Sequence, residues 1–78
     1  MSKNEIIVRF ASITDMADKC NSKNKSKRFI PMAENRNGKL FEFGMYDGVR
    51  KKYVLSNIYA TDAAERLAEI ERMLERAS

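Results

Sequence analysis

Two turn dipeptides, Asn37-Gly38 and Asp47-Gly48, divide the middle of the chain into three short apolar runs. Asparagine, aspartate and glycine tolerate the positive φ angles of tight hairpin turns, so each pair predicts a two-residue β-hairpin loop. The three runs cover residues 29–35, 39–46 and 49–56. We therefore expect a three-stranded antiparallel meander, and the remaining segments must pack against it.

The segments on either side of the meander predict one more strand and two helices. Residues 5–11 (EIIVRFA) alternate branched or aromatic residues, which favours a strand. A short helix is predicted over residues 13–21, with Ser12 as its N-cap, because four apolar residues follow the helical period: Ile13, Met16, Ala17 and Cys20. Residues 21–28 are polar and predict a loop.

A second helix is predicted over residues 62–77, with Thr61 or Asp62 as its cap. Its apolar stripe has spacings of four and three residues and consists of Ala63, Leu67, Ile70, Leu74 and Ala77. The expected fold class is α+β: one compact domain over residues 1–78, with a small antiparallel sheet in β-α-β-β-β-α order and both helices on one face.

Two-residue loops would also fix which side chains share a face of the sheet. They pair Phe43 with both Met32 and Lys52. The predicted core face holds Ile30, Met32, Phe41, Phe43, Met45 and Val54, and the opposite face includes Phe29, Tyr46 and Tyr53. Pro31 cannot donate a ladder hydrogen bond, so strand 29–35 is an edge, and the N-terminal strand is expected beside strand 49–56.

Basic side chains are concentrated in the middle of the chain. Residues 19–52 carry ten basic and three acidic side chains, whereas residues 1–18 have a net charge of −1 and residues 53–78 of −2. The predicted topology brings the loop at 21–28 and the second hairpin loop to the same end of the sheet. We call this the basic end, and its seven cations are Lys23, Lys25, Lys27, Arg28, Arg50, Lys51 and Lys52.

Several classes of function lack the residues that they need. The chain has no histidine and a single cysteine, Cys20, so it offers no imidazole ligand, no disulfide and no multi-cysteine zinc site. No nucleophile and base stand in a recognisable pattern, and no glycine-rich phosphate loop is present. We expect a non-enzymatic protein without metal or cofactor. The only apolar run near the N-terminus, residues 6–8, ends at Arg9, so we expect a soluble cytoplasmic protein with no membrane partner.

The first functional hypothesis is a small nucleic-acid-binding accessory protein. Its basic end would contact phosphates, and Phe29, Tyr46 and Tyr53 on the open sheet face would stack on bases. The alternatives are that the loop cations only keep the chain in solution and that the open face is covered by the N-terminal segment or by a homodimer mate. The second hypothesis is a phage-type, anti-CRISPR-like inhibitor or adaptor whose basic end binds an acidic surface of a protein or nucleoprotein machine.

Three families resemble parts of the chain. Residues 12–77 share the α-β-β-β-α order of the double-stranded RNA-binding domain, which implies phosphate contacts from lysines at the start of the last helix. The matching stretch here is TDAAER, which is acidic at that point. The stretch KRFIPMAENRNGKLFEFGMYDG is similar to single-stranded-DNA modules of the Pur-alpha type, and three strands followed by a helix resemble the arm-binding domains of phage integrases. We assign the chain to none of these families.

Overall fold

The computed structural model describes all residues 1–78 and begins with a 22-residue helix, α1 (Lys3–Asn24). Ser2 caps this helix: its hydroxyl accepts the backbone N–H of Glu5 at 3.2 Å and donates to the Glu5 carboxylate at 3.1 Å. The buried residues of α1 are spaced by four and three positions and are Ile6, Phe10, Ile13, Ala17 and Cys20. The predicted strand at 5–11 is therefore wrong, because the helical period through Ile6 and Phe10 outweighs the local alternation and leaves Val8 in solvent.

Three antiparallel strands follow in the order β1 (Phe29–Arg36), β2 (Lys39–Asp47) and β3 (Lys52–Asn57), which confirms the predicted meander. The chain ends with α2 (Ala63–Ala77), whose buried stripe agrees with the predicted one. The α+β class is confirmed, with the order α-β-β-β-α. No strand pairs with the outer edge of β3, so the predicted fourth strand and its position beside β3 are wrong.

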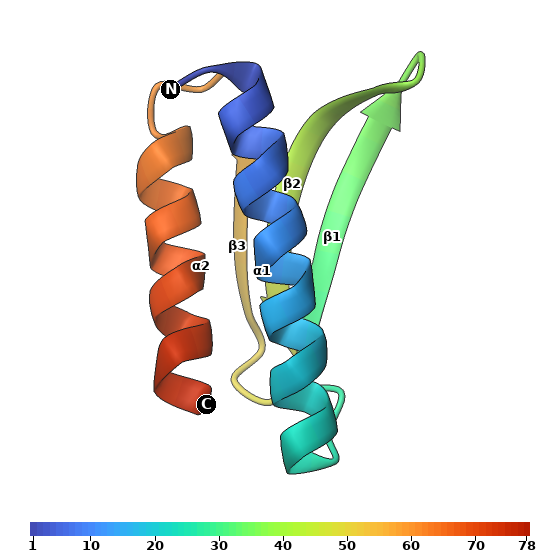
Figure 1. Ribbon diagram of the computed structural model, residues 1–78, viewed down its shortest axis with the longest axis vertical. Coiled ribbons are helices and arrows are strands. Elements are labelled where there is room, and N and C mark those ends of the chain that lie inside the picture. Colours follow the sequence, from blue (N-terminus) through green and yellow to red (C-terminus); the bar gives the residue numbers. More distant parts are fainter.

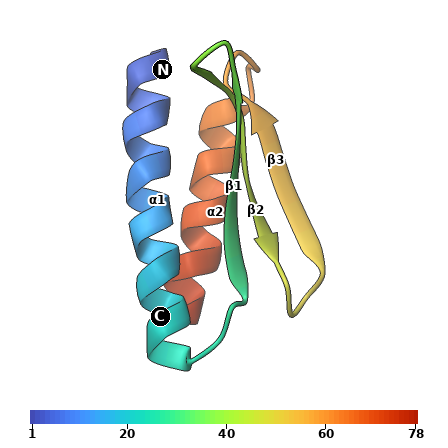
Figure 2. The same cartoon turned by 90° about the vertical axis from the view of Figure 1, so that its right-hand side faces the viewer.

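Both helices lie on the same face of the sheet, and the other face carries no element (Figure 2). The two helices run side by side, with α1 against β1 and α2 against β3 (Figure 1). The rings of Phe10 and Phe43 pack 5.6 Å apart between α1 and the sheet. One buried cluster of apolar residues thus joins all five elements, and Cys20 is part of it.

The first hairpin has the expected turn but an unexpected register. Asn37 and Gly38 adopt φ angles of 52° and 74°, as a two-residue hairpin turn requires. Beyond the turn, Glu34 pairs with Glu42 but Asn35 pairs with Leu40, so Phe41 is the extra residue of a β-bulge.

The bulge shifts the rest of β1 by one residue and therefore turns its side chains to the opposite faces. Ala33, not Met32, lies opposite Phe43. Ile30 and Met32, predicted in the core, are consequently exposed on the open face. Phe29, predicted on the open face, is instead buried with only 2% of its surface exposed.

The second hairpin loop is longer than the two residues that Asp47-Gly48 predicted. Asp47 pairs with Lys52, so the loop contains four residues, 48–51, and β3 begins at Lys52 rather than at residue 49. Phe43 consequently lies opposite Ser56 instead of Lys52. This shift is an even number of residues and leaves the faces unchanged, so the predicted burial of Phe43, Met45 and Val54 is confirmed.

Candidate functional site

Asp47 organises the loop between β2 and β3. Its side chain is completely buried, and its Oδ1 accepts the backbone N–H groups of Val49 and Arg50 at 3.0 Å each. Lys51 then takes a left-handed conformation, with a φ angle of 54°, which returns the chain to β3. The aspartate therefore acts as an internal cap for this loop, and it fixes the backbone at Val49 and Arg50.

Arg28 pairs with Asp47 from the neighbouring strand. Its Nε donates to both carboxylate oxygens at 3.1 Å, and its Nη2 donates to Oδ2 at 3.0 Å. Burial by itself raises the pKa of Asp47, but the hydrogen bonds from Arg28 and from the two backbone N–H groups outweigh it and hold that pKa below its ordinary value of 3.8. Asp47 is therefore a charged carboxylate at neutral pH, and its charge is compensated by Arg28.

Further hydrogen bonds fasten the end of α1 to the sheet and to α2. The Asn21 side chain donates to the carbonyl of Phe29 at 2.8 Å and accepts its N–H at 3.1 Å. Asn24 donates to the carbonyl of Ala77 at 3.5 Å. The N–H of Gly48 donates to the carbonyl of Arg28 at 2.7 Å. The end of α1, the start of β1, the β2–β3 loop and the end of α2 thus gather at one end of the molecule (Figures 1 and 2).

The structure places the seven cations of the basic end in three of these segments. Lys23 lies in the last turn of α1, Lys25 caps that helix, and Lys27 and Arg28 lie beside the β2–β3 loop. Lys52 forms an ion pair with Glu69 at 3.6 Å, so it is directed to α2. Five of the cations have no carboxylate within 4.0 Å, and they are Lys23, Lys25, Lys27, Arg50 and Lys51.

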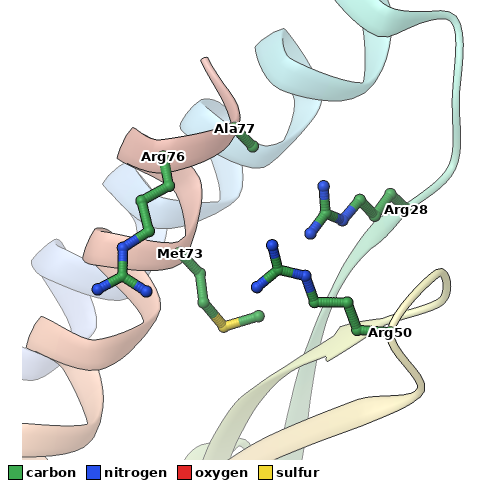
Figure 3. Close-up of a pocket in the computed structure, with 5 residues that line it drawn as sticks. All are labelled: Arg28, Arg50, Met73, Arg76 and Ala77. Carbon is green, nitrogen blue, oxygen red and sulfur yellow. The ribbon is translucent and has the colours of Figure 1, made fainter.

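An arginine that the sequence reasoning did not include completes this site. Arg76, in the last turn of α2, lines a small hollow with Arg28, Arg50, Met73 and Ala77. Figure 3 shows the guanidinium groups of Arg28 and Arg50 side by side, whereas the side chain of Arg76 extends along α2, away from both, with Met73 between them. Its position near a helix C-terminus explains Arg76 locally, and only the packing of α2 beside the loop reveals that it lines the same hollow as the other two arginines.

A second hollow adjoins the first, because Arg28 and Ala77 line both. It has a volume of about 270 Å³, and its other lining residues are Cys20, Asn21, Asn24, Ser26 and Phe29. We refer to the two hollows together as the basic groove. It runs between the ends of the two helices and the β2–β3 loop, and it combines guanidinium groups with amide and hydroxyl groups.

The three aromatic residues proposed for base stacking are not brought together. Phe29 is part of the core and has no accessible ring face, so its assignment to the open face is wrong. Tyr46 and Tyr53 do lie on the open face, with ring centroids 6.1 Å apart and planes inclined by 50°. The two tyrosines pack on each other at a tilt, as aromatic pairs commonly do, and their stacking on bases stays a prediction.

The remaining chemistry of the chain offers few other sites. No three histidine, cysteine, aspartate or glutamate side chains gather as metal ligands would. Neither helix combines the length and the apolar character of a membrane span. No protein-family model matches the sequence, and no curated protein or solved structure matches it either.

Proposed function

We propose that this protein is a non-catalytic, cytoplasmic nucleic-acid-binding protein that holds phosphate groups of the backbone at its basic end. The observation that carries the proposal is the gathering of cations without a carboxylate partner at one end of the molecule, where Arg28, Arg50 and Arg76 line the basic groove. Asp47 is compensated by Arg28, and Glu75 lines a separate hollow with Lys19 and Lys23. Cations held together without acidic partners repel one another, and a bound polyanion relieves that repulsion.

The arginines of the basic groove suit phosphate in particular. A guanidinium group offers five N–H donors in a planar fork that matches two oxygens of a phosphate. The guanidinium groups of Arg50 and Arg76 donate no hydrogen bond within the protein, whereas Arg28 is occupied by Asp47. Arg50 and Arg76 are thus the groups we expect to contact phosphate directly, with Arg28 and Asp47 as the positioning pair.

This arrangement differs from the contact that the double-stranded RNA-binding domain implies. In that family the start of the last helix supplies the lysines, but here α2 begins with Asp62 and Glu65. An acidic helix start repels phosphate, so the proposed contact lies at the opposite end of α2, where Arg76 is found.

The salt dependence of binding to labelled single- and double-stranded oligonucleotides tests the proposal. With about five phosphate contacts, log affinity should fall against log salt with a slope of about −3.5 for single strands and about −4.5 for a duplex. The double variant Arg50→Gln/Arg76→Gln should reduce the magnitude of that slope by about 1.5 to 2.

The matched control is Lys3→Gln/Lys39→Gln, which removes the same charge at the other end of the molecule, where the N-terminus and the first hairpin lie (Figure 1). The control should leave the slope unchanged. Equal losses in both double variants would contradict the proposal, since they would report only net charge. Absence of binding even at low salt would also contradict it, and would favour the hypothesis that the basic end seeks an acidic protein surface.

A further inference from the structure

The open face of the sheet is an ordered grid of nine residues, and two of its three rows are apolar. The strand pairing aligns Ile30 with Tyr46 and Tyr53, then Met32 with Gly44 and Leu55, and finally Glu34 with Glu42 and Asn57. The large apolar side chains at the outer positions of the first two rows are 40–46% exposed, whereas both helices lie on the opposite face. A continuous apolar patch of this kind marks an interaction surface.

A hollow lies among the side chains of the open face. It has a volume of about 120 Å³ and is lined by Met32, Ala33, Glu34, Glu42, Tyr53 and Leu55. Gly44, at the centre of the grid, is itself buried, because a Cβ atom there would lie 2.6 Å from the carbonyl oxygen of Val54 and 3.0 Å from Cδ1 of Leu55. The close approach of β3 thus keeps this position free of a side chain.

The two ends of the open face have opposite charge. Glu34 and Glu42 form one end, and Glu42 has no basic partner within 4.0 Å, whereas Arg36 pairs with Glu34. The β2–β3 loop with Lys51, which has no acidic partner within 4.0 Å, lies beyond the other end, next to Tyr46 and Tyr53. If two copies packed face to face with their β2 strands parallel, the acidic ends would meet each other and the basic ends would meet each other. If the β2 strands were antiparallel, the acidic end of each copy would meet the basic end of the other.

We propose that a second copy of this chain covers the open face, related to the first by a two-fold axis that crosses the strands between the Tyr46 row and the Gly44 row. In this arrangement the Tyr46 row of each copy lies on the Gly44 row of the other. Tyr53 packs on Leu55 of the second copy, and Glu42 approaches its β2–β3 loop. The interface is self-complementary in charge, as a two-fold dimer requires.

The size of the face predicts a weak, reversible dimer. Three strands about 4.8 Å apart and about 25 Å long offer roughly 350 Å² per copy, well below the roughly 800 Å² per partner of a standard interface. Edge-to-edge pairing through β1 is disfavoured, because Pro31 lacks a backbone donor and the bulge twists this strand.

Sedimentation equilibrium over a wide concentration range measures this dimer directly. The mass should rise from 9.0 kDa towards twice that value as the concentration approaches about 0.5 mM. Leu55→Glu puts a charge into the centre of the face and should weaken the dimer more than tenfold. Val8→Glu is the matched control: Val8 is exposed on α1, away from the face, and its substitution should leave the dimer intact. Circular dichroism verifies that both variants are folded.

A charge exchange tests the direction of packing. Glu42→Lys and Lys51→Glu should each weaken self-association, but a mixture of the two variants should associate more tightly than either alone, because both inter-copy contacts become attractive again. The proposal is overturned by a constant mass of 9.0 kDa at every concentration, by equal effects of Leu55→Glu and Val8→Glu, or by a mixture that gains nothing. A monomer whose oligonucleotide binding is lost in Leu55→Glu would likewise overturn it and assign the face to nucleic acid. The mass measurements do not depend on whether the basic end binds phosphate.

Discussion

Replacing Asp47 by asparagine removes the buried carboxylate charge while keeping nearly the same shape. The new side chain can still accept the N–H groups of Val49 and Arg50, but it presents an NH₂ group or a neutral oxygen to Arg28. Breaking a buried ion pair costs about 3–5 kcal/mol when the surviving charge stays buried. The Arg28 side chain is 26% exposed and can be partly rehydrated, so we expect a loss of about 2–3 kcal/mol. Domains of this size have a total stability of roughly 4–12 kcal/mol.

Urea unfolding followed by circular dichroism measures this loss. With an m-value of about 1 kcal/mol per molar urea, the midpoint should fall by about 2–3 M at neutral pH. The difference should also depend on pH. The pKa of Asp47 is lower in the folded protein than its ordinary 3.8, so the stability that it provides is present above that ordinary value and is lost as the pH falls through the folded pKa. The wild-type and Asp47→Asn curves should therefore converge at acidic pH.

The double variant Arg28→Met/Asp47→Asn separates the ion pair from the role of Asp47 in the loop. Removing both partners leaves no uncompensated charge, so the double variant should be more stable than the sum of the two single losses predicts, by at least about 1 kcal/mol. A midpoint change below about 0.5 M for Asp47→Asn, or strictly additive losses, would refute the reasoning about this pair.

Three further substitutions test the fold by thermal unfolding. Ile6→Ala should cost about 2–4 kcal/mol and Val8→Ala less than about 0.5, because in a helix Ile6 is buried and Val8 is exposed. In a strand the two side chains would lie on the same face, so equal costs would support the strand at 5–11 instead. Phe29→Ala should cost about 3–5 kcal/mol and exceed Ile30→Ala by at least about 2, and the reverse order would contradict the bulge at Phe41. Gly44→Ala should cost about 1–3 kcal/mol, since its Cβ would clash with the backbone of β3. An unchanged stability would contradict this prediction and show that β3 can shift to make room for the methyl group.

The meander and α2 could be predicted because local chemistry decides them. Asn37 and Gly38 take the positive φ angles that their residue types favour, and the stripe of α2 has no competing pattern. The N-terminal helix was also within reach of the sequence: Ser2 and Glu5 form a capping pair ahead of a stripe that runs without interruption to Cys20. The error came from weighing the short alternation at residues 6–10 above this longer period.

The register could not be predicted, because it depends on how side chains pack after the strands have met. A bulge at Phe41 inserts one residue, and one residue is enough to exchange Phe29 and Ile30 between the core and the open face. The longer second loop has a comparable origin. Asp47 turns inward because Arg28 is present on the neighbouring strand to compensate its charge, and a turn dipeptide alone carries no information about that partner.

The topology alone was sufficient to bring Lys27, Arg28 and the β2–β3 loop to one end, and the structure agrees. It was not sufficient to add Arg76, whose position depends on the direction of α2 and on its packing against β3. The sequence therefore predicts only those residues of the site that lie in strands and loops joined by recognisable turns.

Nuclear magnetic resonance titration of the ¹⁵N-labelled protein with a short single-stranded oligonucleotide tests the central claim most directly, because each backbone amide reports separately. We predict shifts confined to residues 23–28, 48–51 and 73–77, with the amides of Asn37, Gly38 and Lys39 unchanged at the far end. Shifts concentrated on the first hairpin or on the start of α2, or no shifts at low salt, would contradict the claim that the basic end is the phosphate-binding surface.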